Sequence, residues 1–576
     1  MLKQVQHDGR FWAVAACSLL AGCTTVPRTA SAPVEVQILA INDFHGNLEP
    51  PRNAIEVTLG DGSVAKVPAG GVAYLAGAAK ALREGQKRSV TVSAGDMIGA
   101  SPLVSALFLD EPSVTAMNLV GVEYNAVGNH EFDKGSAELL RMQSGGCAKH
   151  TPRAPCRVEP FAGARFRFLA ANVVTQSGAT LFPGTGIKDF GDVQIGFIGM
   201  TLKETATLVT PAGVAGLTFA DEAATANAAV PALKTAGADA IVLLIHQGAR
   251  TKGSYNDKSC PGLEGDVLPI LDRLDPAIGV VLSGHTHAAY ICERARAGGG
   301  APILLTSAGR YGTLITDLRL TVDPVRGLVA RRADNVIVQG EGFGDVPLSS
   351  AAPRFDADAA TKAVVDRYVA AAKPEAARVV GRMSGAATRT LDADRESSAG
   401  NLVADAQLAA GRRAGAQIAF INSGGVRTDL TPAADGSLTF GDLFAMQPFG
   451  NSIVVKTLNG AQLKALLEQQ FASGTNSAQQ PNMLLPSRGF AFDYDLSKPP
   501  GQRIVRMTLD GRAIDPAGTY RVAVNNFLAS GGDNFTVLAS GADATDAGTD
   551  VDALEAYVRG GVKAPATDRV RDVTPR

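Results

Sequence analysis

The chain has 576 residues, a formal charge of −2, 45% hydrophobic residues and 19% charged residues. This composition belongs to globular proteins that are long enough for two or more domains, each with its own core. Acidic and basic residues nearly balance and no basic run stands out, which argues against a nucleic-acid duplex as a partner.

The N-terminus has the pattern of an export signal. Lys3 and Arg10 precede the apolar run FWAVAACSLL at residues 11–20, which is too short to span a bilayer as a mature helix. The sequence LAGC, which ends in Cys23, resembles the lipobox of bacterial lipoproteins. In those proteins this cysteine becomes the lipidated first residue. A plain secretory signal with an incidental cysteine is the alternative, and either signal exports the protein.

We therefore expect residues 1–22 to be a lipoprotein signal peptide and residues 23–33 to be a flexible tether. No other run in the sequence is long and apolar enough to be transmembrane. The mature body is expected to be exported and anchored to a bacterial membrane only through a lipid on Cys23, facing the periplasm or the cell surface.

Export also bears on the cysteines of the mature chain. Apart from Cys17 and Cys23, there are four: Cys147, Cys156, Cys260 and Cys292. An even number favours disulfides in an oxidising compartment. The spacings do not resemble those of a cysteine metal site. Three pairings remain open, of which Cys147 with Cys156 would close a short polar loop.

Three segments follow the tether. Residues 34–340 alternate short apolar runs with longer amphipathic stretches, which predicts a sheet covered by helices. Residues 341–377 form a linker whose Ala-rich, charged part predicts a helix with Pro374 near its end. Residues 378–576 begin with turn-rich sequence and then carry apolar runs of their own. The chain is therefore predicted to be an α/β protein with two domains and a linker helix.

Most histidines stand where an apolar, strand-like run ends. Five such runs end in Asp43, His45, Asp96, Asn129, His130, Asp133, His246, His285 and His287. Ligands of α/β sheets bind beyond the carboxyl ends of the strands. A single Asp or His at a strand end is usually a satisfied loop residue, but five ends in one domain predict a site for divalent transition metals. The number of donors exceeds the need of one tetrahedral ion and indicates two ions that share a bridging carboxylate.

The motifs INDFHGN, SAGD, VGNHEFD and SGHTH, in this order, resemble the calcineurin-like metallophosphoesterase domain. Their spacing and the second half of the chain resemble the exported 5′-nucleotidase and UDP-sugar hydrolase family, from about Val34 to Val562. This resemblance implies an N-terminal four-layer sandwich, the linker helix and a C-terminal α/β domain that binds the nucleotide.

The resemblance also implies which residues hold the metals. One ion is held by the residues that match Asp43, His45 and His287, and Asp96 bridges to the second ion. The second ion is held by the residues that match Asp96, Asn129, His246 and His285. Some relatives carry Gln or Asn where this chain has His287, and a third imidazole favours softer ions such as zinc. Zinc, manganese and cobalt are all candidates for the native ions.

His130 is expected to take part in catalysis rather than in metal binding. It is adjacent to the ligand Asn129, so its imidazole can enter the site from another direction. Asp133 could hold the ring in one tautomer and favour its charged form. The family assigns this pair to catalysis in the same way. Glu131, between them, has no role that the sequence indicates beyond that of a loop carboxylate.

The second domain contains four stretches similar to nucleotide-binding motifs of the family. They supply Arg395, Asn401, Asn422, Gly424, Gly425, Arg427, Phe449, Phe527 and Asp533. Arginines offer planar forks for phosphate oxygens, two Phe rings could sandwich a base, and Asp533 could accept hydrogen bonds from a ribose. Taken alone, Phe449 is more often a core residue, and a lone Arg is usually a surface residue.

The expected function is metal-dependent hydrolysis of nucleoside 5′-monophosphates to nucleoside and phosphate, with pyrophosphate bonds of nucleotide sugars or dinucleotides as further substrates. The nearest alternative is a 2′,3′-cyclic-nucleotide phosphodiesterase with 3′-nucleotidase activity. An alternative of another class is a non-catalytic surface lipoprotein that binds nucleosides. The family resemblance further implies that the linker permits rotation of the two domains. Base preference, native metal and oligomeric state stay open.

Overall fold

The computed structural model describes residues 32–51, 54–59, 63–209, 211–343 and 346–575. The predicted signal peptide, its lipidation residue Cys23 and nearly all of the tether lie outside these ranges. Among the described residues, no helix has both the length and the apolar character that a membrane crossing requires.

The first sheet of the N-terminal half (residues 32–343) has six strands in the order β16-β15-β1-β4-β5-β6. Their bounds are β1 Val34–Ile41, β4 Ser89–Ser93, β5 Val122–Ala126, β6 Arg167–Leu169, β15 Leu314–Asp323 and β16 Gly327–Ile337. The strands β1, β4, β5 and β6 are parallel, whereas β15 and β16 pair antiparallel. Four carboxyl ends therefore meet along one edge of this sheet.

The second sheet also has six strands, in the order β13-β14-β12-β11-β9-β8. Their bounds are β8 Thr185–Asp189, β9 Gln194–Thr201, β11 Ala240–His246, β12 Ile278–Ser283, β13 Ala289–Arg294 and β14 Ile303–Ala308. The four central strands β9, β11, β12 and β14 are parallel. Their carboxyl ends also point to one edge.

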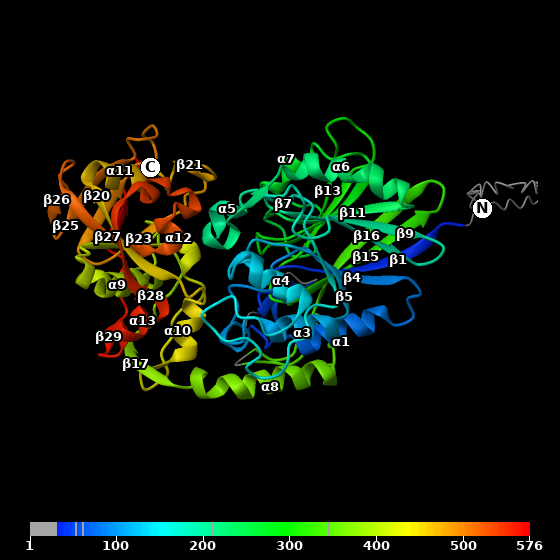
Figure 1. The fold of residues 1–576 in the computed structure, drawn as a ribbon, viewed down its shortest axis with the longest axis horizontal. Helices are drawn as coiled ribbons and strands as arrows, with labels where there is room; N and C mark the ends of the chain where they lie inside the picture. The colour runs from blue at the N-terminus through cyan, green and yellow to red at the C-terminus, as the bar shows by residue number, and fades with distance from the viewer. Residues whose placement is uncertain (1–31, 52–53, 60–62, 210, 344–345, 576) are drawn as a thin grey trace, which may run out of the picture.

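Helices cover the outer face of each sheet (Figure 1). The first sheet packs against α1 Val72–Arg83, α3 Glu111–Val120 and α4 Ser136–Ser144, and the second packs against α6 Glu222–Thr235 and α7 Val267–Leu271. A third apolar cluster fills the space between the sheets. This order of helix, sheet, sheet and helix confirms the predicted four-layer sandwich.

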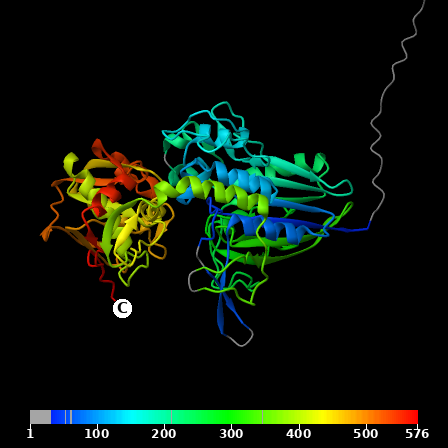
Figure 2. The same ribbon diagram turned by 90° about the horizontal axis from the view of Figure 1, so that it is seen from below.

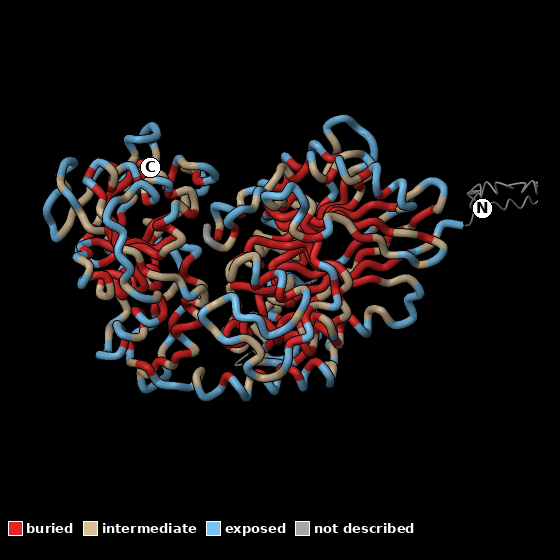
Figure 3. The backbone as a smooth tube through the Cα atoms, in the orientation of Figure 1, coloured by how far each residue is buried: buried red, intermediate tan, exposed pale blue. Residues whose placement is uncertain are grey.

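Strand β1 illustrates how its sequence suits an inner layer. Successive side chains of a strand point to opposite faces. Ile38 and Ala40 belong to the apolar cluster between the sheets, whereas Leu39 and Ile41 pack beneath the helices. A strand buried on both faces needs a continuous apolar run rather than an alternating one. Figure 3 shows that most strands of both sheets are buried.

Shorter elements of the N-terminal half lie outside the two sheets or at their loops. They are β2 Ala54–Thr58, β3 Val64–Pro68, α2 Leu103–Ala106, η1 His130–Phe132, β7 Val173–Thr175, α5 Thr205–Leu208, η2 Pro211–Val214 and β10 Leu217–Phe219. Helix α2 and the residues after it matter for the contact with the C-terminal half, and η1 carries part of the candidate site.

Helix α8, Ala359–Ala376, forms within the stretch that was expected to contain the linker helix. The side chain of Asp358 caps its N-terminus by accepting a hydrogen bond from the Thr361 N–H at 2.9 Å. The helix packs against α1, α2 and α3 of the N-terminal half and against α10, Phe440–Met446, of the C-terminal half. Figure 2 shows the helix lying along the N-terminal half, with one end at the C-terminal half.

The C-terminal half (residues 377–575) is built on a five-stranded mixed sheet in the order β23-β18-β27-β20-β28. Its strands are β18 Ile418–Asn422, β20 Ser452–Asn459, β23 Leu484–Pro486, β27 Thr519–Asn525 and β28 Ala542–Thr549. A four-stranded sheet consists of β24 Phe490–Tyr494, β25 Ile504–Leu509, β26 Arg512–Ala513 and β30 Val570–Asp572. A three-stranded sheet consists of β17 Val379–Ser384, β19 Ser437–Thr439 and β29 Val562–Lys563.

The helices of this half are α9 Ser398–Gly411, α11 Gly460–Glu468, α12 Asn526–Ala529 and α13 Asp550–Val558, besides α10. Short 3₁₀ turns are η3 Arg412–Ala414, η4 Ser423–Gly425, η5 Gly532–Asn534 and η6 Thr536–Ser540, and β21 Ala472–Ser473 pairs with β22 Asn476–Ser477. The main core cluster of this half also contains side chains of the N-terminal half.

The two halves share an apolar contact beside α8. Leu103, Leu107 and Phe108 of the N-terminal half belong to the same buried cluster as the core of the C-terminal half. The Phe108 ring packs edge-on against Tyr368 of α8, with 5.1 Å between centroids. Rotation of the two halves relative to each other stays a prediction, and this apolar contact is one that such a rotation would have to accommodate.

The structure resolves the cysteine pairing that the sequence left open. Cys147 bonds to Cys156, nine residues apart in sequence, and Cys260 bonds to Cys292, 32 residues apart. The second bond ties the loop after β11 to β13, and Cys292 is buried. A cross-link restricts the unfolded chain more when it closes a longer loop.

Removing the longer cross-link is expected to cost more stability. The variant Cys260→Ser/Cys292→Ser should lose about 2–4 kcal/mol of unfolding free energy, because its unfolded chain regains the larger conformational freedom. Thermal and urea unfolding of this variant and of Cys147→Ser/Cys156→Ser check the prediction. A larger loss in the second variant would contradict it.

Candidate active site

The predicted strand-end residues converge. Asp43 follows β1, Asp96 follows β4, Asn129 follows β5, His246 ends β11, and His285 follows β12. These strands belong to both sheets, and their carboxyl ends meet at one place. Relative exposure is 3% or less for Asp43, Asp96, Asn129 and His246, so the donors form a buried cluster.

Asp43, His45 and His287 form one ligand group. Nε2 of His45 lies 3.0 Å from Nε2 of His287, and Oδ1 of Asp43 lies 3.4 Å from His287 Nε2 and 4.0 Å from His45 Nε2. The three donor atoms lie within 4.8 Å of one another. One divalent ion fits such a spacing of nitrogen and oxygen donors.

Asp96, His246 and His285 form a second group. Oδ2 of Asp96 lies 2.9 Å from Nε2 of His246, and Oδ1 of Asn129 lies 3.1 Å from Nδ1 of His285. The same Asp96 oxygen lies 3.6 Å from Nε2 of His45 in the first group. Asp96 therefore stands between the groups, where the resemblance placed the bridging carboxylate.

Hydrogen bonds to the histidine rings also suit metal binding, because they engage the ring nitrogens that face away from the cluster. His45 Nδ1 lies 2.9 Å from the Gly99 carbonyl, and His246 Nδ1 lies 2.8 Å from the Ala94 carbonyl. With Nδ1 as the donor, each ring turns a bare Nε2 toward the cluster. Nε2 of His246 is buried, and its close neighbour is Oδ2 of Asp96 at 2.9 Å.

Burial and neighbouring charges together set the pKa values of this cluster: at His246, burial acts to lower the pKa, but the Asp96 carboxylate outweighs it and raises the pKa to about 10. Burial lowers the pKa of His45 and of His285 to about 3 and raises that of Asp43 to about 7. For Asp96, burial acts to raise the pKa, but the charges of His246 and His130 outweigh it and hold the pKa well below its usual value. His45 and His285 are therefore neutral near pH 7, as metal ligands must be.

His130 lies beside the two groups rather than within either. Its Nδ1 is 2.9 Å from Oδ2 of Asp133, and its ring centroid is 5.1 Å from that of His45. Burial acts to lower the pKa of His130, but the Asp133 carboxylate outweighs it and raises that pKa. The geometry is that of a charged imidazole held at the edge of the metal groups.

Glu131 is the residue of this cluster that sequence reasoning missed. Its buried carboxylate accepts backbone N–H bonds from Asp96 at 3.0 Å, Met97 at 2.8 Å and Gly128 at 2.7 Å. These N–H groups belong to the loops that carry two expected ligands, Asp96 and Asn129. The sequence offered one sign of this role, the position of Glu131 between Asn129 and Asp133. The backbone donors could not be foreseen, because Asp96 and Met97 are more than 30 residues away and Gly128 lies in a turn.

Replacing Glu131 with glutamine should weaken metal binding by about 10–100-fold, as loss of a ligand's supporting partner commonly does. The glutamine amide keeps one acceptor oxygen but turns an NH2 group toward a backbone N–H, so the loops around Asp96 lose one of two acceptor oxygens. Metal titration of the variant measures the effect. Glu222→Gln is the matched control, since buried Glu222 accepts the Lys203 N–H, in a loop that carries no expected ligand. Equal metal affinity in the two variants would contradict the prediction.

Arg427 and Phe449 reach the metal groups from the C-terminal half. The Phe449 ring stacks on His130 with 6.1 Å between centroids and 21° between planes, and the Arg427 guanidinium lies 5.7 Å over the Phe449 ring. Nη2 of Arg427 is buried and has no hydrogen-bond partner. A buried, unpaired guanidinium nitrogen needs an acceptor, which an anionic substrate would provide.

Asn422, Gly424, Gly425, Phe527 and Asp533 gather at the carboxyl ends of β18 and β27. Asn422 Nδ2 donates to Asp533 Oδ2 at 2.6 Å, and the turn η4 brings in Gly424 and Gly425. Phe527 lies in α12, directly before the turn that carries Asp533. The η5 turn also contacts α5 of the N-terminal half.

Asn401 and Arg395 lie elsewhere in the C-terminal half. Asn401 is buried in α9 and donates to Glu396 at 2.5 Å and to the Ala566 carbonyl at 2.8 Å, which is an interior contact. Burial raises the pKa of Tyr494, and the neighbouring charge of Arg395 acts against that rise. Their roles toward a substrate stay predictions.

Arg389 was missed by sequence reasoning. Burial lowers its pKa, and the neighbouring charge of Arg427 lowers it further. Its backbone N–H donates to Asp429 at 2.7 Å. The positive charge of Arg389 therefore lies close to that of Arg427.

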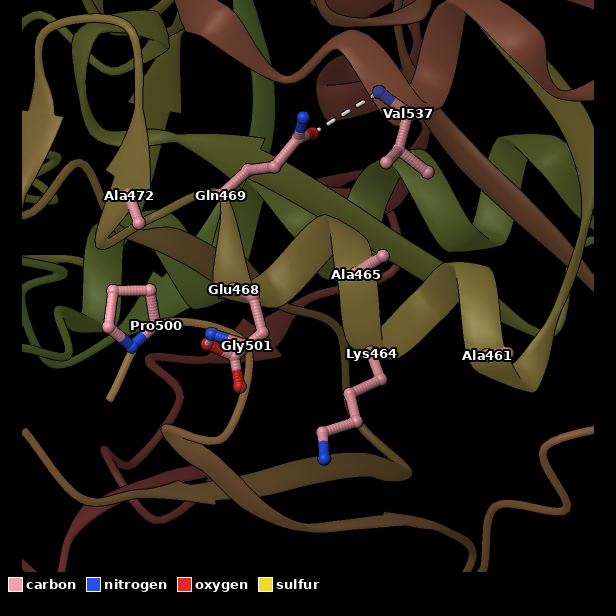
Figure 4. Close-up of a pocket in the computed structure, with 9 residues that line it drawn as sticks. All are labelled: Ala461, Lys464, Ala465, Glu468, Gln469, Ala472, Pro500, Gly501 and Val537. Atoms are coloured by element: carbon pink, nitrogen blue, oxygen red, sulfur yellow. Dashed lines mark hydrogen bonds between the residues drawn. The ribbon is translucent and has the colours of Figure 1, made fainter. Parts of the chain in front are cut away.

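A separate surface hollow of about 430 Å³ lies on α11, as Figure 4 shows. It is lined by Ala461, Lys464, Ala465, Glu468, Gln469, Ala472, Pro500, Gly501 and Val537. The Glu468 carboxylate accepts hydrogen bonds from the N–H groups of Gly501 and Ile504. None of the predicted site residues lines this hollow.

Comparison with known proteins supplies two family matches. The model of the calcineurin-like phosphoesterases matches residues 36–289. The model of the 5′-nucleotidase C-terminal domain matches residues 379–540. The first match covers all the residues of the two metal-ligand groups, and the second covers the predicted nucleotide-binding residues.

Individual relatives align with most of this chain. The chain is 29% identical over 530 residues to Endonuclease YhcR of Bacillus subtilis and 30% identical over 538 residues to Cell wall protein Lmo0130 of Listeria monocytogenes. The aligned parts cover 92% and 89% of this chain, but only 40% and 65% of those proteins. The crystal structure of a 5′-nucleotidase precursor from Thermus thermophilus is 26% identical with a TM-score of 0.74, covering 94% of this chain and 100% of that one.

Proposed function

Since the chain belongs to the family that joins a calcineurin-like phosphoesterase domain to a 5′-nucleotidase C-terminal domain, we propose that it hydrolyses nucleoside 5′-monophosphates to nucleoside and phosphate. The observation that carries this proposal is the unpaired Arg427 Nη2 and the adjacent Phe449, which face the metal-ligand groups from the C-terminal half. Pyrophosphate bonds of nucleotide sugars or dinucleotides are further proposed substrates.

The family and the two ligand groups imply divalent metal ions. We propose zinc, manganese or cobalt, with Asp43, His45 and His287 around one ion and His246, His285 and Asn129 around the other. Asp96 would contact both. When bound, such ions polarise phosphoryl oxygens and lower the pKa of a water molecule.

The chain's own residues have distinct tasks in this proposal. Arg427 binds phosphoryl oxygens through its free nitrogen and orients the phosphate. Asp133 holds Nδ1 of His130, so that Nε2 carries the proton that passes to the leaving 5′ oxygen. Phe449 and Phe527 are the proposed platforms for the base, and Asp533 is the proposed acceptor for ribose hydroxyls.

We also propose that the protein is exported and anchored by a lipid on Cys23. The lipobox-like LAGC sequence supports this, and two disulfides in the mature chain suit an oxidising compartment. Residues 34–340 and 378–576 would act as metal domain and nucleotide domain, with residues 341–377 as the linker.

A substrate panel on metal-stripped protein tests the function, with zinc, manganese or cobalt added back. The panel contains AMP, 3′-AMP, 2′,3′-cyclic AMP, UDP-glucose, NAD and single- and double-stranded DNA, the last because one relative is named an endonuclease. We expect AMP to have the highest kcat/KM. Dominant turnover of the cyclic nucleotide or of DNA would overturn the proposal, and binding of nucleoside without any turnover would favour a non-catalytic protein.

A further inference from the structure

An ion pair between the buried carboxylate of Asp110 and the partly exposed Lys134 lies beside Gly99, in the loop that follows Asp96. Lys134 Nζ donates to Oδ2 of Asp110 at 2.6 Å, and the Asp110 side chain is fully buried. Ser105 Oγ donates to the other carboxylate oxygen at 2.7 Å. Neither Lys134 nor Asp110 belongs to the ligand set or to the catalytic pair described above.

The backbone at Asp110 is held in an uncommon conformation. Leu109 and Asp110 have φ values of 58° and 64°, in the left-handed region that favours glycine. Two consecutive non-glycine residues in this region cost free energy, so surrounding contacts must fix them. The conformation places the Asp110 carboxylate inward, where it meets Lys134 and a backbone segment of the site.

That segment is Gly99–Ala100. The Gly99 N–H donates to Oδ2 of Asp110 at 3.3 Å, and the Gly99 carbonyl lies 2.9 Å from Nδ1 of His45. The next N–H, of Ala100, donates to Oδ2 of Asp133 at 3.1 Å. Two adjacent residues thus link Asp110 with an expected metal ligand and with the partner of His130.

Packing leaves this segment little room on its other side. Gly99 has φ 81°, and a Cβ on it would lie 2.2 Å from the His130 carbonyl oxygen. The segment therefore already lies against the η1 turn, and glycine alone permits this approach. The hydrogen bond from the Gly99 N–H to Asp110 is a second contact that fixes the segment.

We propose that Asp110 and Lys134 are a positioning pair. Through the Gly99–Ala100 segment, the pair fixes the positions of the His45 ring and the Asp133 carboxylate. Asp110 fixes the Gly99 peptide, and Lys134 compensates the buried carboxylate, which without a partner would be an unpaired buried charge. This inference rests on the proposed function only for its effect on turnover. Its effect on metal affinity follows from the Gly99–His45 contact alone.

Burial and charge at the pair agree with this role. Burial acts to raise the pKa of Asp110, but Lys134 outweighs it and holds that pKa below its usual value. Burial acts to lower the pKa of Lys134, but Asp110 outweighs it and raises that pKa. Both groups therefore stay charged near neutral pH.

The test is a set of variants measured by zinc and manganese titration, by thermal unfolding and by kcat and KM for AMP. Lys134→Met should weaken the binding of one of the two ions by about 10–100-fold and lower kcat by a similar factor, as losses of supporting contacts do. KM for AMP should change less than about twofold, since the nucleotide contacts lie in the other half. Lys134→Arg should keep wild-type values, because it retains the charge and a donor for Asp110.

The matched control is Lys188→Met. Lys188 pairs with Glu123 at 2.7 Å in the same half, and its side chain is 27% exposed compared with 25% for Lys134. It should leave both metal affinities unchanged. If Lys134→Met does not fold, Asp110→Asn/Lys134→Met decides: both charges are gone, the Asn oxygen still accepts the Gly99 N–H, and metal affinity should return to within about threefold of wild type.

The outcomes are separable from those of the substrate panel. Wild-type metal affinity and kcat in Lys134→Met, or losses equal to those of Lys188→Met, would overturn the positioning role. A folded Asp110→Asn/Lys134→Met variant whose metal affinity stays about 10-fold or more below that of the wild type would also overturn it. If the wild-type protein binds two ions but hydrolyses no nucleotide, the proposed function fails, and the metal titrations still decide on the pair.

Discussion

Asp96→Asn is expected to lower kcat for AMP to less than about one hundredth of the wild-type value and to abolish the binding of two ions together. Asp96 is the one carboxylate that lies near both ligand groups, 2.9 Å from His246 Nε2 and 3.6 Å from His45 Nε2. Loss of a residue that only supports a ligand already costs about 10–100-fold, so loss of the shared ligand should cost more.

The asparagine keeps the size of the side chain and one oxygen. That oxygen can accept the backbone N–H of His130, which Asp96 Oδ1 accepts at 2.9 Å in the wild-type protein. The variant therefore isolates the charge at the shared position. Asp317→Asn is the control: Asp317 lies on β15 of the same sheet and pairs with Arg319. Metal content and AMP hydrolysis are measured for both. If Asp96→Asn binds two ions and keeps near wild-type turnover, Asp96 is not the shared ligand.

His130→Ala is expected to lower kcat by about 10²–10⁴-fold while both ions stay bound, because a proton donor is lost and no ligand is. The KM for AMP should change little. Metal content, measured beside the kinetics, separates this variant from the ligand variants. His150→Ala, in an exposed loop, is the control and should behave as the wild-type protein does.

The pH dependence gives this prediction a second readout. A proton donor must be protonated, so kcat should fall as pH rises through the pKa of His130. Asp133 raises that pKa above 6.5 despite burial, so the donor remains charged near neutral pH. Asp133→Asn removes the carboxylate and should move the alkaline fall of kcat to lower pH. An unchanged profile in Asp133→Asn, or loss of metal in His130→Ala, would contradict the assignment.

The metal groups could be predicted from sequence because their geometry follows from topology. Parallel strands place their carboxyl ends at one edge, so residues directly after β1, β4 and β5 lie near one another, and the packing of the two sheets brings the ends of β11 and β12 to the same place. The backbone itself takes part: Asp43, Asp96 and His285 all have φ between 49° and 72°, in tight turns directly after strands. Apolar runs predicted the strands, and the polar residues that end them predicted the site.

The supporting residues could not be predicted in this way. Glu131 accepts N–H groups from Asp96 and Met97, some 35 residues earlier, and these contacts depend on how the loops pack. The Asp110–Lys134 pair likewise joins two turns that sequence spacing does not relate. Residues of this kind become visible only when the hydrogen bonds of buried backbone groups are traced.

The C-terminal half shows a further limit. Motif similarity named Asn401 and Arg427 together, but the structure buries Asn401 against Glu396 and leaves a nitrogen of Arg427 free beside His130. A motif fixes residue type and spacing, whereas the side that each residue faces depends on the helix or loop that carries it. The disulfide pairing had the same limit, since four cysteines allow three pairings.

The central claim is that two divalent ions bind between the ligand groups that share Asp96. Anomalous diffraction from crystals of the protein grown with zinc or manganese tests it most directly. The account predicts two peaks per chain, one among Asp43, His45 and His287 and one among Asn129, His246 and His285, with Asp96 beside both. A single peak, or peaks away from these residues, would contradict it.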